Sequence, residues 1–149
     1  MSRLHLQYLI VCALSTLIAG LVVGIFVIAL NKRFTGLALV AGYITNLTVA
    51  GAVAIMAGRK TSKAYKLEDA RLGSVAGLWM GVWVGLGAVL GMVLLALSLS
   101  WLFSAIGVQS DIRSGLIGVF GVVSALICIF ASRIAGRETA HPPEEEEAT

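Results

Sequence analysis

Ionisable side chains are scarce in this sequence and are confined to short segments. Only 13% of the 149 residues are charged, about half the usual share in soluble globular domains. Residues 72–106 contain no Asp, Glu, Lys, Arg or His at all. Proton relays, ion-coupled pumps and voltage sensors place such residues inside membrane helices, where burying a charge is costly. The sequence therefore argues against these function classes.

Proline, histidine and cysteine are also scarce. Both prolines, at positions 142 and 143, lie near the C-terminus, so no long apolar segment contains the helix break that many transporters use to build a substrate site. His5 and His141 lie outside the apolar segments, where they cannot ligate haem within a membrane. Cys12 and Cys128 are expected to be buried thiols, because disulfides are rare in reducing compartments. We expect no cofactor and no metal.

Motifs typical of catalysis are missing as well. The sequence contains no nucleophile–base pair, no phosphate-binding loop and no dinucleotide-binding motif. We therefore expect that the protein is not an enzyme. The net charge of +3 does not indicate nucleic acid as a partner, because the basic residues lie at the edges of the apolar segments.

Long apolar segments make up most of the chain, and 58% of its residues are hydrophobic. A helix needs roughly 20 apolar residues to cross a bilayer, and four segments meet or nearly meet this length. We predict an all-α integral membrane protein, a four-helix bundle of Gly-rich, tightly packed helices. Its domain covers residues 1–140, and an acidic tail that we expect to be disordered follows at 141–149. The predicted spans are residues 8–30, 34–58, 76–103 and 114–133.

Basic and aromatic residues predict the orientation of these spans. Most of the 11 basic residues lie at the two termini or between the second and third spans. The positive-inside rule then puts both termini in the cytoplasm, and we expect the plasma (inner) membrane as the location. Trp79 and Trp83 lie near one end of the third span and Trp101 lies near the other, about 33 Å away along a helix. We expect these tryptophans to lie at the membrane interfaces, with the Trp79 and Trp83 side facing lipid or a partner.

Glycines recur at four-residue spacing, which places them on one side of a helix. Such stripes let two helices approach closely, and close packing is a main source of attraction between helices in lipid. Two interpretations stay open: packing within the bundle, or docking of another subunit. The glycines are Gly73, Gly77, Gly81 and Gly85 in the third span, Gly87 and Gly91 on a neighbouring face of it, and Gly20 and Gly24 in the first span.

Asn46 is the most polar residue at mid-membrane depth in the predicted spans, and Thr45 and Thr48 lie beside it. An amide left unpaired in hydrocarbon costs a few kcal/mol. We therefore predict a hydrogen bond from Asn46 to a Ser or Thr on a neighbouring helix. Contact with a substrate or ion, or across a subunit boundary, remains an alternative.

The loop between the second and third spans is the most basic part of the chain. Each of its cations would attract anionic headgroups by roughly 1 kcal/mol, and docking of an acidic partner is the alternative. Residues 63–72 also have a helical pattern, so we expect the third helix to begin within this loop, with Glu68 and Asp69 near its start. The basic residues are Arg59, Lys60, Lys63, Lys66 and Arg71.

Two functions fit a chain that is rich in packing surfaces and lacks intramembrane charge. The first is a non-catalytic accessory or structural subunit of a larger membrane protein assembly. The second is a homo-oligomeric pore or small-solute facilitator lined by Thr45, Asn46 and Thr48. The expected partners are membrane lipids and either other membrane subunits or further copies of this chain.

Overall fold

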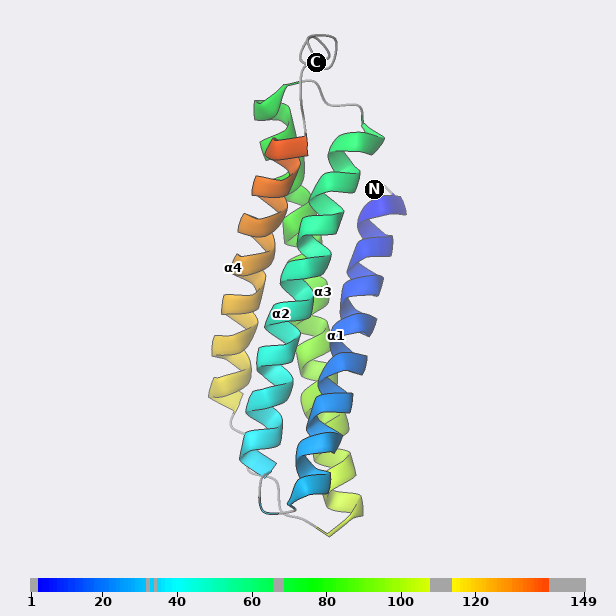
Figure 1. The fold of residues 1–149 in the computed structure, drawn as a ribbon, viewed down its shortest axis with the longest axis vertical. Coiled ribbons are helices and arrows are strands. Elements are labelled where there is room, and N and C mark those ends of the chain that lie inside the picture. The colour runs from blue at the N-terminus through cyan, green and yellow to red at the C-terminus, as the bar shows by residue number, and fades with distance from the viewer. Residues whose placement is uncertain (1–2, 32, 34, 66–68, 108–113, 140–149) are drawn as a thin grey trace.

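Four helices make up the described part of the protein, and they run alternately up and down along one long axis (Figure 1). The structure is a computed structural model that describes residues 3–31, 33, 35–65, 69–107 and 114–139. All four helices are long and apolar enough to cross a membrane. The all-α class is therefore confirmed, while the predicted acidic tail at 141–149 lies outside the described residues. The helices are α1 (Arg3–Leu30), α2 (Thr35–Ala64), α3 (Ala70–Ala105) and α4 (Ser114–Thr139).

The two middle helices in this arrangement are α2 and α3. They contact each other and both outer helices, whereas α1 and α4 have no pair of Cα atoms within 8 Å. The bundle is therefore flattened, with α1 and α4 on opposite sides of the α2–α3 pair. The α3–α4 interface is the most extensive of all the helix pairs.

The start of α3 differs from the prediction that one helix runs from residue 63 into the third span. Lys63 and Ala64 still belong to α2, and α3 begins only at Ala70. Asp69 caps the new helix, because its Oδ1 accepts a hydrogen bond from the backbone N–H of Arg71 at 3.0 Å. An aspartate cap satisfies one of the free N–H groups at a helix start, which fixes the start at that residue.

Glycine also marks the other end of α3. The backbone N–H of Gly107 donates to the carbonyl of Ser104 at 3.1 Å, and Gly107 has a φ of 76°. Residues with a Cβ rarely adopt this conformation, so glycine suits the turn that ends the helix.

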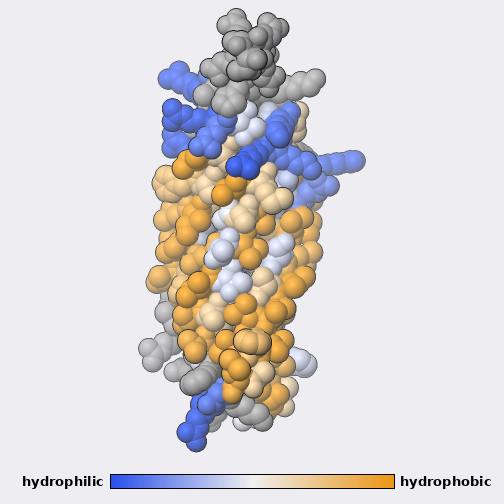
Figure 2. Space-filling model, in the orientation of Figure 1, coloured by the Kyte–Doolittle hydropathy of each residue, from blue (hydrophilic) through white to orange (hydrophobic). Residues whose placement is uncertain are grey.

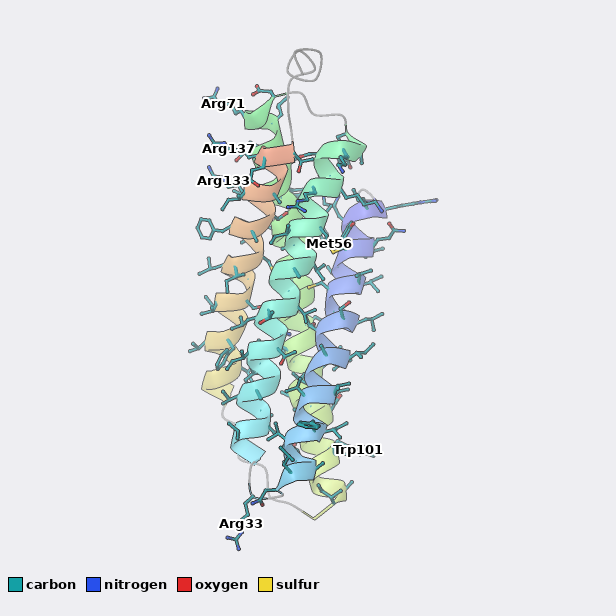
Figure 3. All side chains as sticks on the ribbon, in the orientation of Figure 1. Arg33, Met56, Arg71, Trp101, Arg133 and Arg137 are labelled. Atoms are coloured by element: carbon teal, nitrogen blue, oxygen red, sulfur yellow. The ribbon has the colours of Figure 1, made fainter. Side chains whose placement is uncertain are left out.

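Charged residues lie at the two ends of the bundle, and apolar surface lies between them (Figure 2). We call the end at which α1 begins and α4 ends the basic end. Figure 3 shows Arg71, Arg133 and Arg137 there and Arg33 at the opposite end. The surface between the ends exposes large apolar side chains, among them Val22, Phe26, Leu97, Trp101 and Phe130. Such a surface is unfavourable in water and suits hydrocarbon.

Candidate functional site

The glycine stripe of α3 packs against α4 of the same chain. A Cβ added to Gly81 would lie 2.6 Å from the Cα of Ile129, and one added to Gly85 would lie 3.2 Å from the Cα of Ala125. Gly77 approaches the carbonyl oxygen of Ser132 still more closely. Gly73 belongs to the same face, since its carbonyl oxygen approaches Gly136 of α4. These four glycines therefore allow backbone-to-backbone contact between α3 and α4.

The remaining predicted glycines pack α1 against α3. Near the basic end the small residues are on α3: Gly87 lies against the carbonyl of Leu9 and Gly91 against the hydroxyl of Thr16. In the other half of the interface the small residues are on α1, and large side chains of α3 pack against them. Gly20 receives Leu95 and Gly24 receives Leu99. The structure thus places every glycine of the predicted interface set against another helix of this chain.

Asn46 joins three helices in the middle of the bundle. Its side chain is fully buried, its Nδ2 donates to the carbonyl of Ala88 at 3.3 Å, and its Oδ1 accepts from the Ser124 hydroxyl at 3.1 Å. The interhelical bond expected for this amide is therefore present. Thr45 and Thr48 instead donate to carbonyls of their own helix, those of Ala41 at 2.8 Å and Ile44 at 3.1 Å.

The three tryptophans differ in their surroundings. Trp79 is 56% exposed, and Trp101, near the opposite end of α3, is 73% exposed. Trp83 is only partly exposed, because its ring lies 6.1 Å from that of His5 on α1. The face expected to meet lipid or a partner is therefore partly covered at Trp83 by the chain itself.

The four basic loop residues that the structure describes lie on two different helices. Arg59, Lys60 and Lys63 lie on the last turns of α2, and the Lys60 ammonium lies 6.0 Å from the centre of the Tyr8 ring. Lys66 lies outside the described residues. Arg71 lies in the first turn of α3. The four described cations of this loop are therefore divided between α2 and α3.

Arg71 instead lines a pocket of about 320 Å³ between the start of α3 and the end of α4. Arg133 and Arg137 line its α4 side, and Ser74 and Val75 line its α3 side. Figure 3 shows the three arginines one above another on one side of the bundle. The sequence analysis missed Arg133 and Arg137 as partners of Arg71. Their four-residue spacing and their place on the predicted cytoplasmic side were the available signals.

A second surface feature of the α3–α4 pair is an apolar hollow of about 490 Å³. Two glycines of α4 form part of it, and they differ in exposure: Gly118 is exposed, whereas Gly121 is buried beside Val89 of α3. A Cβ added to Gly118 would meet no atom within 4 Å, and one added to Gly121 would meet only the Val89 methyl groups, at 3.8 and 3.9 Å. The lining residues are Val89, Val93, Ile117, Gly118, Gly121, Val122 and Ala125.

The two cysteines are both buried but cannot readily form a disulfide. Cys12 lies on α1 and Cys128 on α4, and their side chains belong to one buried cluster. No Cα atom of α1 lies within 8 Å of a Cα atom of α4. Disulfides usually need Cα atoms 4.4–6.8 Å apart. The Cys128 thiol donates to the carbonyl of Ala50 at 3.6 Å. Over the part of the chain that the structure describes, no three His, Cys, Asp or Glu residues come close enough to hold a metal ion.

Comparison of this chain with known protein families, with curated proteins and with solved structures finds no match. The function must therefore be argued from the packing surfaces and the charges of the chain itself.

Proposed function

We propose that this protein is a non-catalytic subunit of a larger membrane assembly, and that the α3–α4 hollow receives a transmembrane helix of a different protein. The observation that carries the proposal is Gly118, an exposed glycine of that hollow at which an added Cβ would meet no atom within 4 Å. The alternative, a homo-oligomeric pore, has less support because the side chains expected to line it are bonded within the chain.

Insertion of the four helices into a membrane is the first part of the proposal. The helices are long and apolar enough to span, and the charged surface at the two ends is separated by an apolar band (Figure 2). Most of the described basic residues lie at the end where α1 begins and α4 ends. The positive-inside rule then gives both termini a cytoplasmic location.

The use of glycine inside the bundle supports a helix as the occupant of the hollow. Gly81 shows the pattern: it lets the α4 backbone approach α3 so closely that a Cβ would lie 2.6 Å from the Cα of Ile129. Gly118 offers the same kind of surface on α4 but meets nothing within 4 Å. In lipid, small residues at a helix surface favour association through close packing. A partner helix would complete at Gly118 the contact that this chain makes for itself at Gly81.

The concave shape of the hollow favours a different protein over a second copy of this chain. In a two-fold symmetric dimer the same patch of each copy faces the other. Two hollows of about 490 Å³ would then face each other and leave a void, and voids lose the dispersion contacts that hold helices together. A protruding helix of another protein fits the hollow without this loss.

The pore alternative has less support because its expected lining is occupied. Asn46 is fully buried and bonded through both ends of its amide, to Ala88 and Ser124. The hydroxyls of Thr45 and Thr48 are bonded to their own helix. A pore between copies of this chain would need polar groups on the outer surface, and Asn46 is directed inward.

The test combines native mass spectrometry with crosslinking at chosen positions. We expect the protein, extracted from its native membrane in mild detergent, to carry a heterologous membrane protein in fixed ratio. A photo-crosslinking residue at Val122 should capture a transmembrane segment of that same protein, whereas one at Val22 on the exposed side of α1 should not. Gly118→Leu should abolish both results without unfolding the chain, since the site is open.

Val119→Leu is the matched control, because Val119 is exposed on the same helix but does not line the hollow. It should retain the partner. A protein that is monomeric under these conditions would overturn the proposal. So would a homo-oligomer without other proteins, and solute flux through that oligomer in liposomes would then favour the pore.

A further inference from the structure

We propose that the pocket formed by Arg71, Arg133 and Arg137 binds the phosphate of an anionic phospholipid headgroup at the cytoplasmic membrane surface. The inference rests on the membrane insertion put forward in the proposed function. It does not depend on a partner helix in the α3–α4 hollow, which lies towards the opposite end of the same pair of helices.

The fold brings these three cations together from distant parts of the sequence. Arg71 lies in the first turn of α3, and Arg133 and Arg137 lie one turn apart in α4. Like charges at this spacing on a helix repel each other by a few tenths of a kcal/mol, and Arg71 adds a third positive charge to the pocket. An anion in the pocket would relieve this repulsion and would gain charge-assisted hydrogen bonds.

One of the three guanidinium groups is already held in place. The Nε of Arg133 donates to the hydroxyl of Ser74 on α3 at 2.9 Å. This bond leaves the two terminal nitrogens of Arg133 available for a ligand, and a guanidinium group presents such donors in a geometry that matches phosphate. An arginine that is oriented before binding loses less entropy when the ligand arrives.

Carboxylates of the described residues do not neutralise the pocket. Asp69 is the nearest in sequence on α3, and its Oδ1 accepts from the backbone N–H of Arg71 as the helix cap. Glu138 follows Arg137, about 100° further around α4. No ion pair joins a described carboxylate to any of the three guanidinium groups. No carboxylate of the described residues therefore competes with a ligand for this pocket.

The apolar surroundings favour a lipid over a soluble anion. Val75 forms part of the pocket wall, and the exposed side chains of Phe130 and Ile134 lie on the same part of α4 as Arg133. Figure 2 shows hydrophilic side chains directly above apolar surface on the side where Figure 3 labels the three arginines. A phosphate held there would sit at the level of the headgroups, with its acyl chains along apolar helix surface. A free phosphate would gain nothing from that surface.

The experiment measures lipid binding to the purified full-length protein by native mass spectrometry in mild detergent. The probes are phosphatidylglycerol, phosphatidylcholine with the same acyl chains, and inorganic phosphate. We expect phosphatidylglycerol to bind more tightly than phosphatidylcholine, because the choline cation faces the arginines unfavourably. Inorganic phosphate should bind far more weakly than either lipid.

Variants then assign the binding to the pocket. Arg133→Gln should weaken phosphatidylglycerol binding by about tenfold, and the triple change of Arg71, Arg133 and Arg137 to Gln by about 100-fold. The matched control changes Arg59, Lys60 and Lys63 to Gln, which removes the same charge from the same end of the bundle. It should weaken binding by less than about twofold if the site is specific.

Each contrary outcome overturns the proposal. Equal losses in the two triple variants would mean a general attraction to the basic end, and no loss in either would mean that the arginines bind no headgroup. Inorganic phosphate that binds as tightly as the lipid would make the site one for a soluble anion. If the triple variant unfolds, Arg137→Gln, at an exposed position, decides in its place.

Two further measurements separate this proposal from the proposed function. Gly118→Leu should bind phosphatidylglycerol as the wild type does, whether or not a partner helix is found. Extraction of the protein from native membranes by alkaline carbonate would instead contradict membrane insertion itself.

Discussion

Replacing one glycine by alanine should have opposite effects at two positions in the α3–α4 pair. In Gly81→Ala the new Cβ would lie 2.6 Å from the Cα of Ile129 and 2.9 Å from the carbonyl oxygen of Cys128. Both are backbone atoms, which cannot rotate away as the end of a side chain can. In Gly118→Ala the new Cβ meets no atom within 4 Å.

The expected magnitude follows from these distances. Non-bonded carbon atoms pack best at about 3.5–4.0 Å, so α3 and α4 must separate by about 1 Å to admit the Gly81→Ala methyl group. A gap of that size loses a quarter to a half of the dispersion attraction between facing atoms. Overpacking of this kind typically costs about 1–3 kcal/mol. The higher helix propensity of alanine, about 1 kcal/mol, acts in both variants and cancels in their difference.

We therefore expect Gly81→Ala to be less stable than Gly118→Ala by about 1–3 kcal/mol. The assay is reversible unfolding in mixed micelles with an increasing fraction of denaturing detergent, followed by tryptophan fluorescence and far-ultraviolet circular dichroism. Gly118→Ala should match or exceed the wild type. Equal free energies of unfolding for the two variants would refute the reasoning, because they would mean that Gly81 does not bring the two backbones into contact.

Two other predictions concern buried polar groups and thiols. Ser132→Ala should leave stability unchanged or raise it by about 1 kcal/mol, because the Ser132 Oγ is buried without a hydrogen-bond partner in the described structure. Ser124→Ala should instead lower stability by about 1 kcal/mol, since it removes the hydrogen bond to Asn46. The same unfolding assay measures both variants. A Ser132→Ala protein less stable than Ser124→Ala would contradict the assigned contacts. Mild oxidation with copper phenanthroline should produce no intramolecular disulfide between Cys12 and Cys128, because the Cα atoms of their helices lie more than 8 Å apart and a disulfide needs a closer approach. Intact mass after alkylation in denaturant checks this. An unalkylated monomer that is two hydrogen atoms lighter than the reduced chain would show that the helices approach more closely.

The hydrogen bonds and glycine contacts illustrate how far sequence reasoning reaches into the candidate sites. The sequence indicated that Asn46 needs a hydrogen-bond partner, because an unpaired amide in an apolar interior is costly. It did not indicate which Ser or Thr residue is that partner, and Ser124 lies 78 residues away along the chain. Four-residue glycine spacing identified a packing face on α3. It did not indicate that α4 of the same chain covers that face.

Helix limits show the same division on a local scale. The apolar runs predicted the number of helices, because their length matches what a helix needs to cross hydrocarbon. The break between α2 and α3 depended on the capping bond of Asp69, a single local interaction that competes with a helical pattern continuing from residue 63. Patterns that average over many residues do not detect one such bond.

The sequence alone therefore determined the all-α class, the apolar spans and the near-absence of charge within them, because these depend on composition and on the period of one helix. Only the tertiary structure decided which faces are used and which remain open. In the structure, α4 covers the glycine stripe that contains Gly81, and Gly118 remains exposed. Arg71 lines a pocket with Arg133 and Arg137 on α4. Contacts between distant helices depend on how their faces are paired in space, and the period of each single helix contains no information about that pairing.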